Sequence, residues 1–215
     1  MKKIDLSLYA ITDEHLLKKD IEKAVEQAIK GGATVVQYRA KNKETKDMYE
    51  EALKIKKICD RYSIPFIIND RIDIALAVDA TGVHIGQEDI PVEVARRLLG
   101  TNKIIGLSTK NLKQVKEANK LPVDYIGFGS IFSTKTKEDV KIAGLEALKK
   151  ALTLSIQPVV AIGGINHQNI DKVLQTGCKN IAVVSAIFKD KKNITQNTKS
   201  LYEKIKKGKT MGFQV

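Results

Sequence analysis

The sequence is poor in the residues that build disulfide frameworks, stacking surfaces and membrane spans. It has two cysteines and no tryptophan in 215 residues. Cys59 and Cys178 are too few and too far apart for a metal cluster or a disulfide staple, so we expect both to be reduced and buried. No apolar run approaches the roughly 20 residues that a bilayer requires, which excludes a membrane-spanning helix. Asp5 and Asp13 interrupt the apolar N-terminal stretch, so no signal peptide is predicted and a cytoplasmic location is expected.

Several catalytic signatures are missing as well. The three histidines form no metal-binding pair, and the sequence contains neither a Walker loop nor a nucleophile elbow. His84 lies in an apolar segment, which favours a hydrogen-bonded core residue over a catalytic base. His15 and His167 are expected in a loop and near the surface.

Acidic residues are outnumbered, and the net charge is +12. Such an excess is compatible with nucleic acid, a membrane surface or small anionic substrates. Lysines concentrate in the segment 189–209, and few aromatic side chains are available for base stacking. We therefore expect most of the charge to be a solvated surface, with small phosphorylated substrates as partners, no nucleic acid and no membrane.

Short apolar runs alternate with amphipathic stretches along the whole chain. Residues Met48, Ala52, Ile55, Cys59 and Tyr62, for example, follow helical spacing. The expected strands are 6–11, 34–38, 65–68, 82–85, 103–107, 124–126, 158–162 and 180–184. Repeated strand–helix units of this kind predict an α/β fold with a parallel sheet, a single (β/α)8 TIM barrel spanning 1–215 with a short basic tail from about 208. The competing open sheet would need a glycine-rich turn after the first strand, and residues 11–15 contain no glycine.

In a barrel, chemistry gathers where the strands end. After the second expected strand, alternation places Gln37, Arg39 and Lys41 on the interior side, where two cations and an amide suit a phosphorylated substrate. The alternative is a cluster paired with acidic residues.

Carboxylates follow the next two strands. Asp70 and Asp89 could share Mg²⁺, which typically takes one or two carboxylates together with substrate phosphates. Both residues also precede expected helices, so helix capping is the other interpretation. Ser108, after the fifth strand, can likewise bind a substrate or cap a helix.

The connection after the sixth strand is long and polar, which is typical of lids and binding loops. Thr134, Thr136 and Lys137 offer donors to phosphate oxygens, although a solvated loop is the alternative. Gly163 and Gly164 follow the seventh strand, and Ser185 follows the eighth. These two slots are the recurrent phosphate site of barrel enzymes, so two separate anion sites are predicted.

Six motifs, taken together, resemble those of thiamine phosphate synthases. They are QYRAK at 37–41, INDR at 68–71, GVHIGQED at 82–89, TKTK at 134–137, VAIGGI at 160–165 and VVSAI at 183–187. They occur in the order of that family. The resemblance implies a transferase that joins 4-amino-5-hydroxymethyl-2-methylpyrimidine diphosphate to 4-methyl-5-(2-phosphoethyl)thiazole, giving thiamine phosphate and pyrophosphate.

The resemblance also implies roles for individual residues, carried over position by position. One Mg²⁺ would be held by Asp70 and Asp89, and the catalytic set would be Arg39, Lys41, Ser108 and Lys137. The pyrimidine diphosphate would be bound by Gln37, Tyr38, Arg39, Ala40, Lys41, Asn69, Ser108 and Lys137. The thiazole phosphate would be bound by Thr134, Lys135, Thr136, Gly164, Val184 and Ser185.

The sequence departs from the family pattern at Ser130 and Ser133, where prolines are common, and at Tyr38, where leucine is usual at an outward-facing position. The nearest alternative is the related thiazole tautomerase, which needs no diphosphate site; Asn69, Asp70, Asp89 and Lys137 argue against it. The most distant alternative is a basic nucleic-acid-binding protein. A homo-oligomer is left open.

Overall fold

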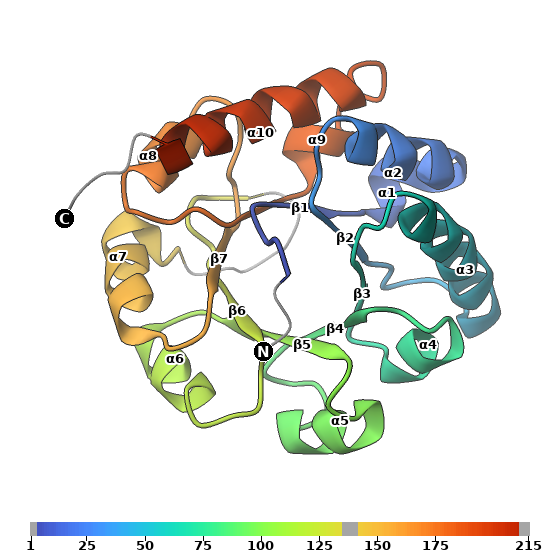
Figure 1. The fold of residues 1–215 in the computed structure, drawn as a ribbon, viewed down its shortest axis with the longest axis horizontal. Coiled ribbons are helices and arrows are strands. Elements are labelled where there is room, and N and C mark those ends of the chain that lie inside the picture. Colours follow the sequence, from blue (N-terminus) through green and yellow to red (C-terminus); the bar gives the residue numbers. More distant parts are fainter. Residues whose placement is uncertain (1–3, 135–141, 211–215) are drawn as a thin grey trace.

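Eight parallel strands close into a barrel in which each strand pairs with the next and β8 pairs with β1 (Figure 1). The computed structural model describes residues 4–134 and 142–210. The strands are β1 (Leu8–Ile11), β2 (Val35–Tyr38), β3 (Phe66–Asn69), β4 (Gly82–Ile85), β5 (Ile104–Thr109), β6 (Tyr125–Phe128), β7 (Val159–Ile162) and β8 (Ile181–Val183). The predicted (β/α)8 barrel is confirmed.

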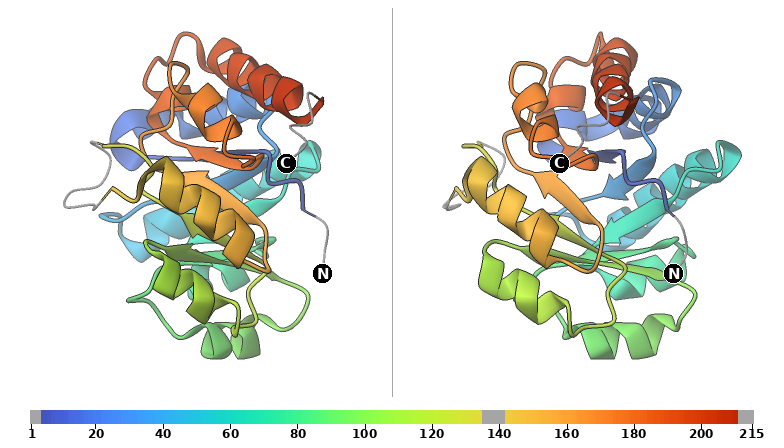
Figure 2. Two further views of the ribbon diagram at one scale, coloured as in Figure 1. Left: turned by 90° about the vertical axis from the view of Figure 1, so that its left-hand side faces the viewer. Right: turned by 60° about the vertical axis from the view of Figure 1, so that its left-hand side comes forward.

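Helices form the outer layer around the strands (Figures 1 and 2). They are α1 (Glu14–Leu17), the 3₁₀ turn η1 (Lys18–Asp20), α2 (Ile21–Lys30), α3 (Thr45–Arg61), α4 (Ile72–Ala77), α5 (Val92–Leu99), α6 (Leu112–Ala118), α7 (Gly144–Leu154), α8 (Ile170–Leu174), α9 (Ser185–Phe188) and α10 (Ile194–Thr210). The last helix reaches Thr210, beyond the point where the basic tail is expected to begin. None of the described helices is both long enough and apolar enough to cross a bilayer.

Burial follows from the two periodicities of the sequence. Side chains alternate along each strand, so one set packs outward against helices and the other fills the barrel. The helical stripe of α3 is buried at Met48, Ala52, Ile55 and Cys59. Both cysteines are free and buried, as predicted. Inside the barrel the apolar cluster is small, comprising Leu6, Tyr9, Ile11, Val35, Ile67, Ile104, Tyr125, Val160 and Ala182.

Three strands continue further than their apolar runs indicate. β3 includes Asn69, β5 continues through Ser108 to Thr109, and β6 continues to Phe128. These added residues keep the strand ladder, with Ser108 paired to Gly127 and Asn69 to His84. Hydropathy marks the end of a strand where polar residues begin. In β3 and β5 polar residues remain in the strands because the upper part of the barrel interior is itself polar, whereas the residues added to β6 are Gly127 and Phe128.

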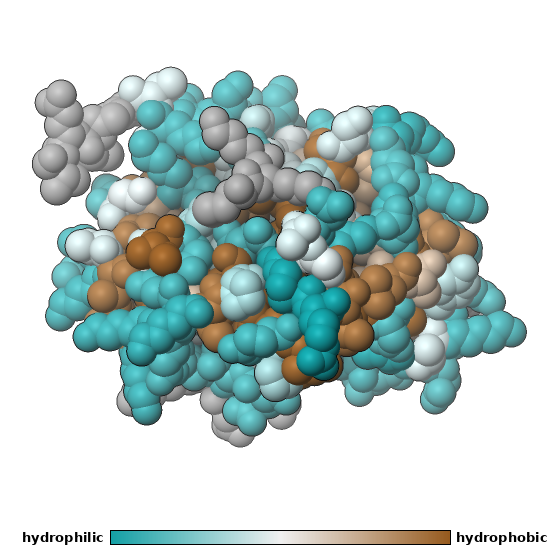
Figure 3. All heavy atoms as spheres, turned by 60° about the horizontal axis from the view of Figure 1, so that its bottom comes forward, coloured by the Kyte–Doolittle hydropathy of each residue, from teal (hydrophilic) through white to brown (hydrophobic). Residues whose placement is uncertain are grey.

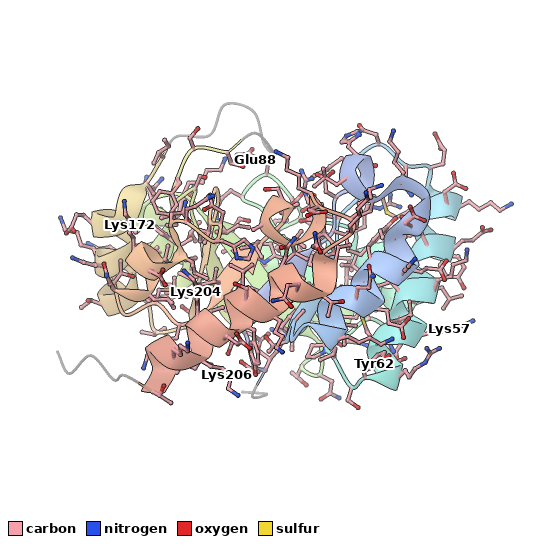
Figure 4. The ribbon with its side chains drawn as sticks, turned by 90° about the horizontal axis from the view of Figure 1, so that it is seen from above. Lys57, Tyr62, Glu88, Lys172, Lys204 and Lys206 are labelled. Atoms are coloured by element: carbon pink, nitrogen blue, oxygen red, sulfur yellow. The ribbon has the colours of Figure 1, made fainter. Side chains whose placement is uncertain are left out.

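The outer surface is largely hydrophilic, with smaller apolar areas between the polar side chains on the face drawn in Figure 3. Many surface lysines pair with carboxylates, such as Lys204 of α10 with Asp171 of α8. The loops that follow the strands gather at one end of the barrel, where Glu88 lies, and Tyr62 lies toward the other end (Figure 4).

Candidate active site

A cavity of about 190 Å³ opens at the carboxyl ends of the strands. Every strand contributes to its lining, including Ile11, Gln37, Asn69, His84, Ser108, Tyr125, Val160, Ile162, Ala182 and Val183. Because all strands run parallel, their ends meet at the same mouth, which is where barrel enzymes place their chemistry.

The floor of the cavity is a buried chain of hydrogen bonds. Gln37 Nε2 donates to Tyr9 Oη at 2.9 Å, and Tyr9 Oη lies 2.8 Å from Tyr125 Oη. His84 Nδ1 is 3.0 Å from Tyr125 Oη, and its Nε2 is 2.9 Å from Ser108 Oγ. His84 is hydrogen-bonded through both ring nitrogens, as expected, but it is half-buried and lines the cavity instead of lying in the core.

Arg39 brings positive charge to the cavity wall. Its side chain is half-buried and lines the cavity, and its backbone N–H donates to Thr12 Oγ1 at 3.0 Å, which ties the end of β2 to β1. Within residues 4–134 and 142–210, the Arg39 guanidinium makes no salt bridge. A half-buried cation without a carboxylate partner is costly unless an anion joins it. Arg39 is therefore arranged for an anionic ligand.

Lys41 behaves differently, because its ammonium forms an ion pair with Asp70 at the rim. Asp70 adopts a left-handed backbone conformation with φ of 62°, and its N–H donates to the His84 carbonyl at 2.9 Å. Burial raises the pKa of the Asp70 carboxyl and Asp89 raises it further, while Lys41 opposes both effects. The carboxyl groups of Asp70, which follows β3, and Asp89, in the β4–α5 turn, thus lie close together.

Neither carboxylate caps a helix. The residue that precedes α4 is Arg71, and α5 follows Pro91. Asp89 Oδ2 instead accepts from the Gly86 N–H at 2.6 Å within its own turn. No set of three or more acidic, histidine or cysteine ligands occurs in the described part of the chain. Two adjacent carboxylates match the way Mg²⁺ binds beside substrate phosphates.

The raised pKa of Asp70 predicts a pH effect on stability. The folded chain holds the Asp70 proton more tightly than the unfolded chain does, so the free energy of unfolding should fall as pH rises from the usual value of 3.8 through the folded-state pKa. Asp70→Asn removes this penalty, and asparagine tolerates the left-handed conformation. In metal-free buffer the variant should unfold at a higher temperature than the parent at pH 7, and this gap should shrink toward pH 3.5. A difference in unfolding temperature that stays constant from pH 7 to pH 3.5 would contradict the raised pKa of Asp70.

Asn69 and Ser108 also line the cavity. The Ser108 carbonyl accepts from Gln87 Nε2 at 2.6 Å, which holds β5 against the turn after β4. Asn111, not Ser108, caps α6, because its side chain accepts from the Gln114 N–H at 3.0 Å. The Ser108 hydroxyl is therefore not used in capping; it contacts His84 on the cavity floor.

The opposite wall is formed by the ends of β7 and β8. Thr134, Gly163, Gly164, Val184 and Ser185 all line it. Gly164 has φ of +67°, and an added Cβ would lie 2.4 Å from the Ser133 carbonyl oxygen. The Phe132 N–H donates to the Gly163 carbonyl at 3.0 Å, so the loop after β6 packs directly on the Gly-Gly turn.

Gly164→Ala should damage this wall. The left-handed backbone costs an alanine about 1–2 kcal/mol, and the clash with Ser133 would displace the loop. We expect the KM for the ligand of this wall to rise about tenfold or more. Gly177→Ala is the matched control, because Gly177 has φ of +90° with nothing within 4 Å of the added Cβ. Steady-state kinetics and thermal unfolding of both variants check this, and equal kinetics in the two would contradict it.

Comparison with known proteins agrees with this geometry. A family model described as thiamine monophosphate synthase matches residues 8–187. The thiamine-phosphate synthase of Persephonella marina is 66% identical over 202 residues, covering 94% of this chain and 96% of the relative. Thiamine-phosphate synthase 1 of Aquifex aeolicus is 47% identical, covering 93% and 94%. The chain belongs to the thiamine monophosphate synthase family.

A solved structure supports the same membership. The thiamine phosphate pyrophosphorylase from Pyrococcus furiosus matches with a TM-score of 0.87 and 41% identity, covering 94% of this chain and 96% of that one. The sequence resemblance and the activity it implies, a transferase that makes thiamine phosphate, are therefore confirmed.

Not every residue that the family resemblance suggests faces the cavity. Tyr38 is buried on the outer side of β2, where its hydroxyl donates to Glu51 of α3 at 2.6 Å. Ala40 and Lys41 are not among the lining residues, and neither are the two predicted metal ligands, Asp70 and Asp89. Lys135, Thr136 and Lys137 lie outside the described residues, so their place in this synthase-family site stays a prediction.

Three further residues of the cavity were not predicted from the sequence. Tyr9 and Tyr125 interrupt apolar strands at interior positions, and a buried phenol requires a hydrogen-bond partner, which is the signal that could have revealed them. Lys110 also lines the cavity and is exposed. It lies immediately after the end of β5, at the mouth of the barrel.

Proposed function

We propose that this cavity binds the pyrimidine diphosphate and the thiazole phosphate side by side, and that its two walls divide between them. The observation that carries the proposal is the half-buried Arg39 on one wall of the cavity and the Gly163–Gly164 turn with Ser185 on the other. The Asp70 and Asp89 pair lies outside this lining, after β3 and β4. One wall offers charge to a diphosphate. The other offers close backbone approach to a phosphate.

The reaction is a substitution at the methylene carbon of the pyrimidine. The bond between that carbon and the diphosphate oxygen breaks with its electron pair going to oxygen, and the lone pair of the thiazole nitrogen forms the new carbon–nitrogen bond. The amino group of the pyrimidine delocalises the positive charge in between. No proton, oxidant or protein nucleophile is needed for this balance, which agrees with a site that has cations and hydroxyls.

The protein then acts mainly by stabilising charge that develops during the reaction. Arg39 holds charge against the departing diphosphate, and Lys41 and Lys137 are proposed to add to it. Gln37, Asn69 and Ser108 are proposed to orient the pyrimidine end. Thr134, Gly164, Val184 and Ser185 are proposed to fix the phosphate of the thiazole.

Asp70 and Asp89 are the residues that would hold Mg²⁺. The raised pKa of Asp70 supports this, because two close carboxylates in a partly buried position are stabilised by a cation. When bound, Mg²⁺ supplies positive charge to the diphosphate oxygens. Without it, the Lys41 ammonium partly neutralises Asp70.

We place the enzyme in the cytoplasm and expect small phosphorylated substrates, not nucleic acid, to occupy its cationic mouth. Duplex binding that weakens with salt, together with no turnover, would contradict this.

The experiment that tests the function is an assay with each substrate alone and with both. Both substrates with Mg²⁺ should give thiamine phosphate and pyrophosphate in equal amounts, with little product after chelation. The thiazole phosphate alone should remain unchanged. Conversion of its tautomer without any joining reaction would instead identify a thiazole tautomerase.

A further inference from the structure

The hydrogen-bond chain on the cavity floor joins two proposed pyrimidine contacts. Gln37 is at one end and Ser108 at the other, with Tyr9, Tyr125 and His84 between them. Tyr9 and Tyr125 are 1% and 0% exposed, so neither phenol can exchange its partner for bulk water. The three middle residues belong to three different strands of the barrel.

Donor and acceptor counting gives this chain a direction. Gln37 Nε2 donates to Tyr9 Oη, and a phenol has one hydrogen to give. If Tyr9 did not donate to Tyr125 Oη, its buried O–H would lack a partner, which is expensive. Tyr125 must then donate to His84 Nδ1, which leaves the proton of the neutral imidazole on Nε2. That nitrogen donates to Ser108 Oγ, so the serine hydrogen remains for the cavity.

The surroundings fit a fixed arrangement of this kind. Burial raises the pKa of both phenols, so each keeps its proton throughout the working pH range. Two strand glycines make room for the rings. A Cβ on Gly106 would lie 2.1 Å from the Tyr125 ring and 2.5 Å from His84 Nδ1, and one on Gly127 would lie 3.1 Å from His84 Cε1.

We infer that Tyr9, Tyr125 and His84 are positioning residues that set the hydrogen-bond polarity of the cavity, with an acceptor at Gln37 Oε1 and a donor at Ser108. A 4-aminopyrimidine carries both an N–H donor and ring-nitrogen acceptors, so it can use both ends at once. The inference rests on the proposed function in taking the pyrimidine as the ligand of these ends. The direction of the hydrogen bonds does not depend on the proposed function.

The direct test is the tautomer of His84 in the full-length protein labelled with ¹⁵N-histidine. NMR shifts of the imidazole nitrogens distinguish a protonated nitrogen from an unprotonated one, and His15→Gln and His167→Gln variants identify the His84 signals. We expect the proton on Nε2. A proton on Nδ1 would mean that donor and acceptor exchange roles in every hydrogen bond of the chain, with the Gln37 amide inverted. That result would overturn the inference.

Tyr125→Phe tests the effect on catalysis. Removing the hydroxyl takes away the hydrogen bond from Tyr125 to His84 Nδ1, so this bond should no longer fix the tautomer. The kcat/KM for the pyrimidine diphosphate should fall about tenfold, the typical net value of one hydrogen bond, while the KM for the thiazole phosphate stays unchanged.

Tyr62→Phe is the matched control. Its hydroxyl also donates a hydrogen bond, to Glu26 at 2.6 Å, but it lies toward the other end of the barrel (Figure 4). Neither the tautomer nor the kinetics should change in this variant. Unchanged kinetics in a folded Tyr125→Phe protein would overturn the positioning role. Failure of the parent to make thiamine phosphate would instead refute the proposed function, and the tautomer measurement would still decide the polarity.

Discussion

Replacing Asp70 with asparagine is expected to lower kcat/KM for the pyrimidine diphosphate by ~10²- to 10³-fold, the loss typical of removing one preorganised electrostatic contact. The amide that replaces the carboxylate has no negative charge to hold Mg²⁺. Lys41 also loses its ion-pair partner, so the charge balance at the rim changes. Pyrophosphate release measured over a range of Mg²⁺ concentrations checks this, and added Mg²⁺ should not restore the parent rate.

Asp79→Asn is the control for this variant. Asp79 also has a left-handed backbone, with φ of 52°, and also pairs with a lysine, Lys103. Its side chain is 84% exposed and does not line the cavity. Both substitutions thus replace an aspartate that has a left-handed backbone and a lysine partner. They differ in where the aspartate lies. A parent-like rate and Mg²⁺ dependence in Asp70→Asn would refute the metal assignment.

Arg39→Gln is expected to cost about 10²-fold in kcat/KM for the pyrimidine diphosphate, because it removes the half-buried cation that has no carboxylate partner in the described part of the chain. The KM for the thiazole phosphate should stay near the parent value, since the other wall is untouched. Arg39→Lys should recover only part of the loss, because an ammonium lacks the planar fork that binds two oxygens together.

Arg97→Gln provides the comparison, because Arg97 is an exposed arginine of α5 outside the cavity. It removes the same charge from the total without changing the site. Equal losses in the two variants would mean that the general basic surface, not Arg39, attracts the diphosphate.

The sequence predicted the barrel because its strand–helix period is regular and local. The place of Asn69 and Ser108 at the cavity could be predicted, because the rule that strand ends meet at one mouth needs only their order. The pairing of Lys41 with Asp70 could not be decided, since a cation near a strand end fits an ion pair as well as a ligand. The contact of Tyr9 with Tyr125 joins residues 116 positions apart across the barrel, and no periodicity encodes it.

Helix capping illustrates the limit in another way. The residues before α4 and α5 suggested carboxylate caps, yet Asp89 accepts from Gly86 inside its own turn. Short polar residues satisfy turns and helix ends with the same atoms, so their sequence position alone does not separate the two. The geometry of the turn decides.

The most direct test of the account is a binding measurement with both substrates on two variants. Calorimetric titration should show that Arg39→Gln loses most of its affinity for the pyrimidine diphosphate and retains the thiazole phosphate, and that Gly164→Ala does the reverse. This reciprocal loss is what one cavity with two distinct walls predicts. If both folded variants lost the same substrate, or if neither lost any, the division of the cavity between the two substrates would be wrong.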